Sequence, residues 1–401
     1  MPTIHTSDDL GMPGLIRCVY DAALDASRWQ EFLVRFGAEF SSQATMIFGQ
    51  DFSDRSVEVT GAPASLAAHH GITEDFMQSF SAHYCRTNVW TEDERLHHEG
   101  QLINGSRVYP DARLASTEWH TDWLRPQDLF YTLAVVVEKR AQRSFNVTAV
   151  RSKRCGPYTA EEEARLRTLV PHLQTAFALH RRLHRAEALA HASLAVLESL
   201  PMGVALLDGQ ACVLHANTRA HALAKATGLL RFDARDDSLR ASASGDDALL
   251  QRALCLAVST GRGLGLGAGH ALRLYGAQGA TQLHVMVTPM PRWSSPFGEQ
   301  TAGAVFISDP TSVPETPQDA LRAFYQLSAA EARLAQALVN GLSLQEYADL
   351  RGISIHTVRS QFKTAAAKVG SGRQADFVRT ILTGPVMLRF APVPGGGSEP
   401  V

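Results

Sequence analysis

A short polar and basic surface is expected on one helix near the end of this 401-residue chain, formed by His356, Arg359, Ser360 and Lys363. Apolar Ile355, Val358 and Phe362 recur between them at helical spacing, so that the polar set faces away from a core. Guanidinium and ammonium groups donate to guanine edges, and small residues between them let a helix enter the major groove. Thr357 and Gln361 flank this surface and suit phosphate oxygens.

The elements that would position these side chains are four short helices within residues 327–382. Ser328 with Glu331, and Ser343 with Glu346, have the spacing of capping boxes, and Ser354 is a third N-cap. Glycines 341, 352 and 370 follow the apolar stripes and predict where three helices end. The turn 351–353 makes the second and third helices a helix-turn-helix. This segment has seven basic and four acidic residues, a net charge of +3, whereas the whole chain carries −2.

Five short segments resemble the LuxR-type helix-turn-helix of bacterial transcription regulators: Leu327–Glu331, Gly341–Ser343, Gly352–Ser354, Thr357–Arg359 and Lys368–Gly370. Arg373-Gln-Ala375 also fits the last helix of that family. The resemblance implies that Arg359, Ser360 and Lys363 face bases, while Thr357 and Gln361 hold the DNA backbone. His356 and Arg373 complete the candidate DNA contacts. Tyr347 and Gln361 depart from the usual residues of the family. The alternative is four ordinary helices with a charged outer face.

A second group of residues could bind a small molecule, and it consists of Trp90, Trp119, Trp123, Arg125 and Tyr131. Aromatic rings with one guanidinium suit an apolar ligand that carries a carboxylate or carbonyl group. The same residues would equally form an ordinary core and its rim. The Trp/Tyr/Asp pattern of acyl-homoserine-lactone receptors is absent from the sequence, so that ligand is not supported.

Residues 10–155 are predicted to form an α+β domain. Apolar positions between 10 and 40 have helical spacing, whereas the short β-branched or aromatic runs 44–49, 56–60, 131–138 and 145–151 indicate strands. Further helical stretches lie near 74–84 and 116–124. The domain resembles, weakly, the GAF-like or autoinducer-binding sensor domains that precede this type of helix-turn-helix.

Residues 159–200 are predicted to form one long signalling or dimerisation helix, which begins with Thr159 and three glutamates. Leu166, Leu169, Leu173 and Ala176 begin a seam at three- and four-residue spacing, and the seam resumes at Ala190. Such a seam suits a second copy of the chain. The alternative is that the helix packs on its own domain.

Residues 203–309 are predicted to form a second α+β domain. The strand–turn–strand–helix pattern from Val204 to Asn217 resembles the start of a PAS domain, in which the asparagine caps the following helix. We expect a linker over 310–326 and a disordered tail over 392–401. The predicted fold is thus multidomain: two α+β sensor-like domains joined by a long helix, plus a C-terminal all-α four-helix helix-turn-helix domain.

Signatures of catalysis, metal binding and membrane insertion are absent from the sequence, so we expect neither an enzyme nor a cofactor. The five cysteines form no CxxC pair, and no run of about 18 uncharged apolar residues occurs. We expect a cytoplasmic homodimer that binds double-stranded DNA and an unidentified small molecule, with RNA polymerase as a further candidate partner and no membrane. The competing hypotheses are a sensor scaffold whose helix-turn-helix does not bind DNA, and an enzyme acting through the N-terminal domain.

Overall fold

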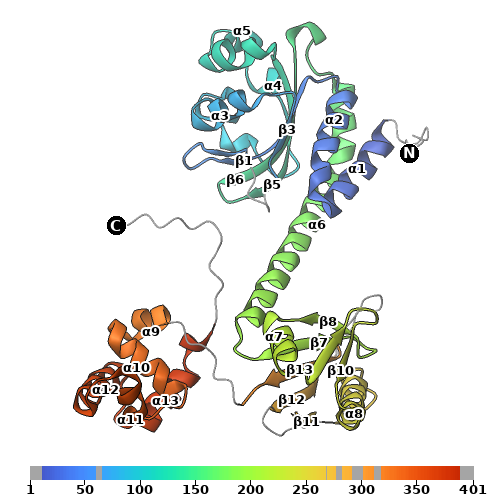
Figure 1. Cartoon of the computed structure of the whole chain (residues 1–401). Coiled ribbons are helices and arrows are strands. Elements are labelled where there is room, and N and C mark those ends of the chain that lie inside the picture. Colours follow the sequence, from blue (N-terminus) through green and yellow to red (C-terminus); the bar gives the residue numbers. More distant parts are fainter. Residues whose placement is uncertain are drawn as a thin grey trace. The chain divides into compact units, whose positions relative to one another are not determined.

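The computed structural model describes residues 11–59, 66–267, 269–276, 282–290, 301–310 and 318–388. Two antiparallel sheets, each packed against helices, are joined by the long helix α6 (Ala160–Ser199), and an all-helical C-terminal region follows (Figure 1). The chain divides into two units, Met1–Ala190 and His191–Val401. The predicted fold class is confirmed. The predicted tail 392–401 lies outside the described residues.

The first sheet has six strands: β1 (Ala44–Asp51), β2 (Val57–Glu58), β3 (Ala68–His70), β4 (Leu102–Asn104), β5 (Tyr131–Arg140) and β6 (Arg143–Arg151). Their order is β2-β1-β6-β5-β4, and β3 pairs with β1. Thr148 of β6 is paired with Met46 of β1 on one side and with Ala134 of β5 on the other, so these three side chains lie on the same face of the sheet. Strands β3 and β4 escaped prediction because three residues give too short an alternation to detect.

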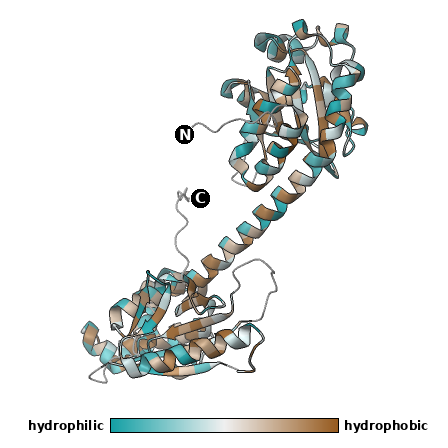
Figure 2. Ribbon diagram, turned by 90° about the vertical axis from the view of Figure 1, so that its right-hand side faces the viewer, coloured by the Kyte–Doolittle hydropathy of each residue, from teal (hydrophilic) through white to brown (hydrophobic). Residues whose placement is uncertain are grey.

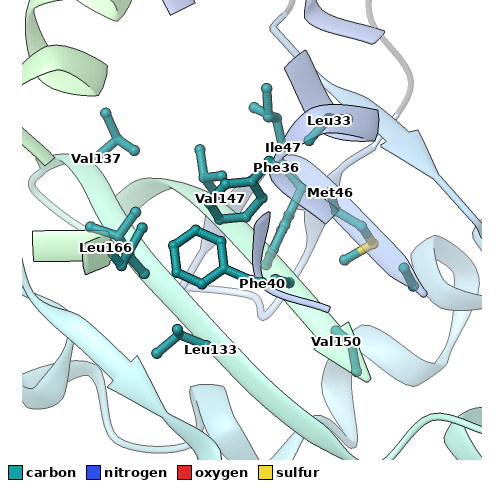
Figure 3. Packing of buried hydrophobic residues seen from close by; sticks show 14 of the residues in the cluster. Leu33, Phe36, Phe40, Met46, Ile47, Leu133, Val137, Val147, Val150 and Leu166 are labelled. Carbon is teal, nitrogen blue, oxygen red and sulfur yellow. The ribbon is translucent and has the colours of Figure 1, made fainter. Parts of the chain in front are cut away.

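Helices cover both faces of the first sheet (Figure 1). One face packs on α1 (Met12–Leu24), α2 (Trp29–Glu39) and the first part of α6, and Figure 3 shows Phe36, Phe40 and Leu166 against Val147. The other face carries α3 (Glu74–Ala82), α4 (Gly105–Val108), α5 (Asp111–Leu114) and a π-helical segment, Trp119–Leu124. Short 3-10 helices occupy Ala26–Arg28, Tyr84–Arg86, Val89–Thr91, Glu94–Leu96, Arg125–Gln127 and Lys153–Cys155.

The first part of the predicted apolar seam of helix α6 packs inside the first domain. Leu166, Leu169 and Leu173 are 0% exposed in the core of that domain. For this part of the helix, the structure agrees with the alternative in which α6 packs on its own domain. Farther along the helix, Leu189 and Val196 are 68% and 57% exposed, and Figure 2 shows hydrophobic residues recurring there. This later part of the helix therefore offers exposed apolar side chains to another molecule.

A buried histidine holds α6 against the beginning of α2. His180 is 1% exposed, and its Nδ1 accepts a hydrogen bond from Trp29 Nε1 at 3.4 Å. The His184 ring meets it edge-on, with ring centroids 4.1 Å apart, and Glu187 Oε2 lies 3.2 Å from His184 Nδ1. Burial lowers the pKa of His180, and the neighbouring His184 lowers it further, so the folded protein holds a neutral imidazole.

Acidification is expected to destabilise the first domain through His180. The unfolded chain protonates this histidine near pH 6.5 whereas the folded chain resists protonation, so the stability it supports is complete above about pH 6.5 and falls below it. Urea unfolding followed by tryptophan fluorescence at about pH 7.5 and about pH 5.5 measures the loss. His180→Phe should lose less stability between these pH values, whereas the exposed control His191→Gln should behave as wild type. An unchanged loss in His180→Phe would contradict this assignment.

The second sheet has five strands in the order β11-β12-β13-β7-β8. They are β7 (Gly203–Leu207), β8 (Val213–Ala216), β11 (His270–Tyr275), β12 (Gln282–Pro289) and β13 (Gly303–Ser308). One face packs on α7 (Thr218–Thr227) and α8 (Ser244–Gly261). Strands β9 (Leu230–Asp233) and β10 (Ser238–Ala241) form a separate pair that the sequence analysis missed. Asn217 caps α7, as the resemblance implied.

In the described part of the C-terminal region there are five helices, one more than predicted: α9 (Gln318–Tyr325), α10 (Ala329–Val339), α11 (Leu344–Arg351), α12 (Ile355–Val369) and α13 (Gln374–Thr383). A short 3-10 helix, Pro385–Met387, follows them. Helix α9 lies within the predicted linker 310–326, and this prediction is wrong for residues 318–325. Leu321 of α9 is 0% exposed in the same core as Leu334, so the helix belongs to this cluster. No helix among the described residues is long and apolar enough to cross a membrane.

Candidate nucleic-acid interface and ligand cavity

Local hydrogen bonds fix the beginning and end of each helix in the helix-turn-helix. Both predicted capping boxes are present, at Ser328/Glu331 and Ser343/Glu346. Gly352 ends α11 with a φ of 62°, a left-handed conformation that glycine adopts without strain. The Ser354 hydroxyl then accepts the backbone N–H of Thr357 at 3.1 Å and starts α12. The turn and the beginning of α12 are thus determined by short-range contacts.

Contacts on the inner side of α12 decide which of its residues face outward. Val358 and Ala365 are 0% exposed, and the Phe362 ring meets Phe377 of α13 with centroids 5.4 Å apart. Lys368 Nζ donates to Glu331 Oε2 of α10 at 2.7 Å. These contacts fix the rotation of α12 about its axis.

The predicted recognition surface lies on the outer side of α12. Its exposed residues are His356, Thr357, Arg359, Ser360 and Lys363. Positions 356, 359, 360 and 363 are three, four and seven residues apart, so they share one helix face. Gln361 is half-buried, and its Oε1 has no hydrogen-bond partner among the described residues. Arg373 is exposed at the N-cap of α13, on a different element from the other six residues.

Two of the seven basic residues in this region are neutralised by neighbouring acids. Lys368 pairs with Glu331, and Arg379 Nη2 lies 2.7 Å from Asp376 Oδ1. By contrast, the part of the chain that the structure describes contains no ion pair to Arg359 or Lys363. The guanidinium and ammonium groups of the outer face are therefore available to an anionic partner.

A cavity lies in the first domain, on the sheet face opposite α1, α2 and α6. Strands β1, β5 and β6 contribute Met46, Phe48, Thr132, Ala134, Asn146, Thr148 and Val150. Ile72, Phe80, Asn88, Trp90, Thr91, His97, Ile103, Trp119 and Trp123 complete the wall. The cavity has about 560 Å³ of empty space, part of it open to solvent. It is mainly apolar, as small-molecule sites are.

Three of the five residues predicted to form a pocket meet at this cavity. Trp119 and Trp123 stack at 4.5 Å between centroids, and Trp90 meets Trp119 edge-on at 5.9 Å. The Trp123 indole donates from Nε1 to the carbonyl oxygen of Phe76 at 3.0 Å. The Nε1 atoms of Trp90 and Trp119 are buried and have no hydrogen-bond partner in the described part of the chain.

Arg125 and Tyr131 do not line the cavity. Arg125 is exposed in the 3-10 helix that follows the π-helical segment. Tyr131 precedes Thr132 on β5, so strand alternation turns it away from the cavity, and its ring packs on Phe130 at 4.8 Å. The guanidinium expected to bind a ligand carboxylate is thus on the surface.

Polar residues of the cavity wall were missed by the sequence analysis. Three of them lie on the predicted strands and alternate with residues of the opposite sheet face: Thr132, Asn146 and Thr148. Polar side chains on a sheet face that helices cover are the sequence signal that could have indicated this cavity. Asn88 accepts the backbone N–H of Trp90 through Oδ1 at 3.0 Å. His97 bonds through Nδ1 to the Asp93 carbonyl at 3.1 Å, and burial lowers its pKa, so the imidazole is neutral at neutral pH.

Within the described residues no group of three His, Cys, Asp or Glu side chains is arranged to hold a metal ion.

No protein-family model matches the chain, and no curated protein matches it. Several solved structures are loosely similar. The LBD domain of VqsR from Pseudomonas aeruginosa is 13% identical with a TM-score of 0.34, over 43% of this chain and 95% of that one.

Two further neighbours are named as a LuxR family transcription factor and as a LuxR-type receptor. The N-acylhomoserine lactone-dependent LuxR family factor CepR2 from Burkholderia cenocepacia is 14% identical with a TM-score of 0.31, over 44% of this chain and 98% of that one. The VqmA dimer of Vibrio cholerae is 18% identical with a TM-score of 0.21, over 49% and 88% of the two chains. TM-scores this low describe only loosely similar backbones, so the function of this chain is argued from its own residues.

Proposed function

We propose that this protein is a transcription regulator that binds double-stranded DNA through α12 and a small molecule in the cavity of its first domain. The observation that carries the proposal is the exposed face of α12, on which Arg359 and Lys363 have no acidic partner among the described residues. A helix that presents such donors beside small residues can read base edges in the major groove.

The proposed contacts divide into base readout and backbone contacts. Arg359, Ser360 and Lys363 are assigned to bases because they lie on the middle of the exposed face. Thr357 and His356, in the first turn of α12, are assigned to phosphates, together with Arg373 at the beginning of α13. Gln361 is half-buried, so its side-chain amide is assigned to the DNA backbone at the edge of the interface.

The cavity is connected to α6 by hydrogen bonds within the first domain. Ile103 lines the cavity, and the next residue, Asn104, donates from Nδ2 to Glu163 Oε1 in the first turn of α6 at 2.7 Å. Asn104 also donates to the Tyr158 carbonyl oxygen at 3.3 Å. A ligand that displaces Ile103 would therefore act directly on the beginning of the long helix. This contact supports the proposal that the cavity controls the rest of the chain.

A homodimer is part of the proposal, and the later part of α6 is its candidate contact. Leu189 and Val196 are more than half exposed there, as they would be on a helix that pairs with a second copy. Two copies would present two α12 helices to a roughly palindromic DNA site. RNA polymerase is a further proposed partner on DNA, and we place the activity in the cytoplasm.

Arg359→Ala is expected to weaken binding to the preferred DNA sequence by about 1–3 kcal/mol, or roughly 5- to 150-fold, and to relax sequence preference. The alanine removes the guanidinium that would bond a guanine edge. The experiment selects bound sequences from random duplex DNA and then titrates the best one by fluorescence anisotropy at two salt concentrations. The wild-type affinity should fall steeply with salt because phosphates release counterions.

Arg379→Ala is the matched control, because Arg379 is exposed in the same region but already pairs with Asp376. Its affinity and sequence preference should stay close to wild type. Equal behaviour of the two variants would refute the assignment of α12. An absence of salt-dependent binding to any duplex would favour the scaffold alternative, in which the helix-turn-helix does not bind DNA.

A further inference from the structure

Two tryptophans that line the cavity of the first domain carry buried N–H donors that no described residue satisfies. Trp90 and Trp119 are 6% and 2% exposed, and both line the cavity. Neither Nε1 atom has a hydrogen-bond partner among the residues that the structure describes. An unpaired buried N–H group is costly, so native proteins rarely leave one without an acceptor. The third tryptophan of the wall, Trp123, is satisfied by the Phe76 carbonyl.

The same cavity carries no formal charge. None of the described residues that line it is Asp, Glu, Lys or Arg. The one titratable side chain of the described wall, His97, is 4% exposed, and its Nδ1 donates to the backbone carbonyl oxygen of Asp93 at 3.1 Å. A carboxylate or an ammonium group brought into such a site would lose its hydration without gaining an opposite charge. This argues against the charged ligand that Arg125 suggested from sequence.

The two observations together define a ligand class. We propose that the cavity takes a neutral, mainly apolar molecule with carbonyl-type oxygens, and that the indole N–H groups of Trp119 and Trp90 donate to those oxygens. The inference rests on the proposed role of the cavity as the ligand site. The parallel rings of Trp119 and Trp123 and the nearby Phe80, whose centroid is 5.6 Å from Trp119, suit a flat or aromatic body. Thr148 and Asn146 lie on the sheet side of the same space.

Three probes of similar size test this class on the full-length protein: acetophenone, which is neutral with a carbonyl oxygen; ethylbenzene, which lacks an acceptor; and benzoate, which is charged. Binding is measured by isothermal titration calorimetry. The wild type should prefer acetophenone to ethylbenzene by roughly tenfold, the contribution of one hydrogen bond. Benzoate should bind at least about tenfold more weakly than acetophenone because no cation lines the cavity.

Tryptophan-to-phenylalanine variants identify the donors, because phenylalanine keeps an aromatic ring and removes the N–H group. The double variant Trp90→Phe/Trp119→Phe should lose the preference for acetophenone over ethylbenzene. Trp123→Phe is the matched control, since its N–H already bonds to Phe76, and it should keep the preference. Comparing the two probes within each variant cancels the effect of the smaller ring on packing. Thermal unfolding shows that each variant is folded.

The outcomes separate this inference from the proposed function. Equal binding of acetophenone and ethylbenzene, binding of no neutral probe, or a preference that survives in the double variant would overturn the ligand class. DNA affinity is measured separately, with and without acetophenone. A tryptophan-dependent preference without any change in DNA affinity would support the ligand class while contradicting ligand control of DNA binding. The DNA-binding assignment itself stands or falls with Arg359→Ala.

Discussion

Replacing Asn217 with alanine is expected to lower the free energy of unfolding of the second α+β domain by about 3–5 kcal/mol. Its side chain is 0% exposed and makes four hydrogen bonds. Oδ1 accepts the N–H groups of Val204 and Ala220, each at 2.9 Å. Nδ2 donates to the carbonyl oxygens of Leu197 at 2.9 Å and Met202 at 3.1 Å. Alanine would leave two buried N–H groups and two partly buried carbonyl groups without this side-chain partner, and each carries a desolvation cost.

Hydrogen exchange of the full-length protein measures this effect at the backbone N–H groups of β7 and α7. Asn217→Asp keeps the oxygen acceptor but loses both N–H donors, so its exchange should be intermediate. Asn340→Ala, at the exposed end of α10, is a control that should exchange as wild type in β7. Unchanged protection in Asn217→Ala would show that Asn217 does not hold the end of α6 to this sheet.

Arg151→Met is expected to destabilise the first domain by about 3–5 kcal/mol, because it breaks a buried ion pair and leaves one charge behind. Arg151 is 4% exposed, and its Nη1 and Nη2 contact the Glu162 carboxylate at 2.6 and 3.1 Å. Its Nε donates to the Gly156 carbonyl at 2.9 Å, and its guanidinium lies 3.9 Å from the Tyr158 ring centroid. Burial opposes ionisation of Glu162, but the bonds from Arg151 hold its pKa below the usual value.

Urea unfolding followed by tryptophan fluorescence checks this prediction, because four of the five tryptophans belong to the first domain. Arg154→Met, an exposed arginine nearby, is the control and should change stability little. Arg151→Met/Glu162→Met should recover part of the loss because no unpaired charge remains. A single variant as stable as the control would mean that the pair does not anchor the first turn of α6.

These two side chains act at opposite ends of the same helix. Arg151 joins the last residue of β6 to the first turn of α6, within the first unit. Asn217 joins the last turn of α6 to β7 and α7, within the second unit. Each end of α6 is therefore fixed to the adjacent sheet by buried hydrogen bonds. A signal carried by this helix needs both attachments, so either variant should also weaken any response of DNA affinity to a ligand.

Most of the helix-turn-helix follows from local sequence. The capping boxes at Ser328 and Ser343 and the left-handed glycine at 352 depend on residues within four positions of each other, so their spacing is sufficient to predict them. The outward face of α12 follows for the same reason, since helical periodicity fixes which side chains lie opposite Val358. The two ends of α6 were likewise predicted within one residue.

Other features depend on contacts between distant segments, and the sequence did not reveal them. Strands β4 and β9 are three or four residues long and exist because a partner strand pairs with them. The sequence predicts a linker where helix α9 forms, because these eight residues are stable as a helix only where Leu321 enters the core of the following helices. The predicted seam of α6 is divided between a buried and an exposed part by the packing of α1 and α2.

The chain by itself therefore determined a helix-turn-helix with a basic outer face, two α+β domains and a long helix between them, because these follow from short-range periodicity and capping. The tertiary structure decided the chemistry of the ligand cavity. It gathered Trp90, Trp119 and Trp123 on one sheet face and left Arg125 on the surface, and it left two of the three indole N–H groups unsatisfied. Which side chains enclose a cavity depends on strand register and on the direction of each residue, and neither is fixed by local spacing.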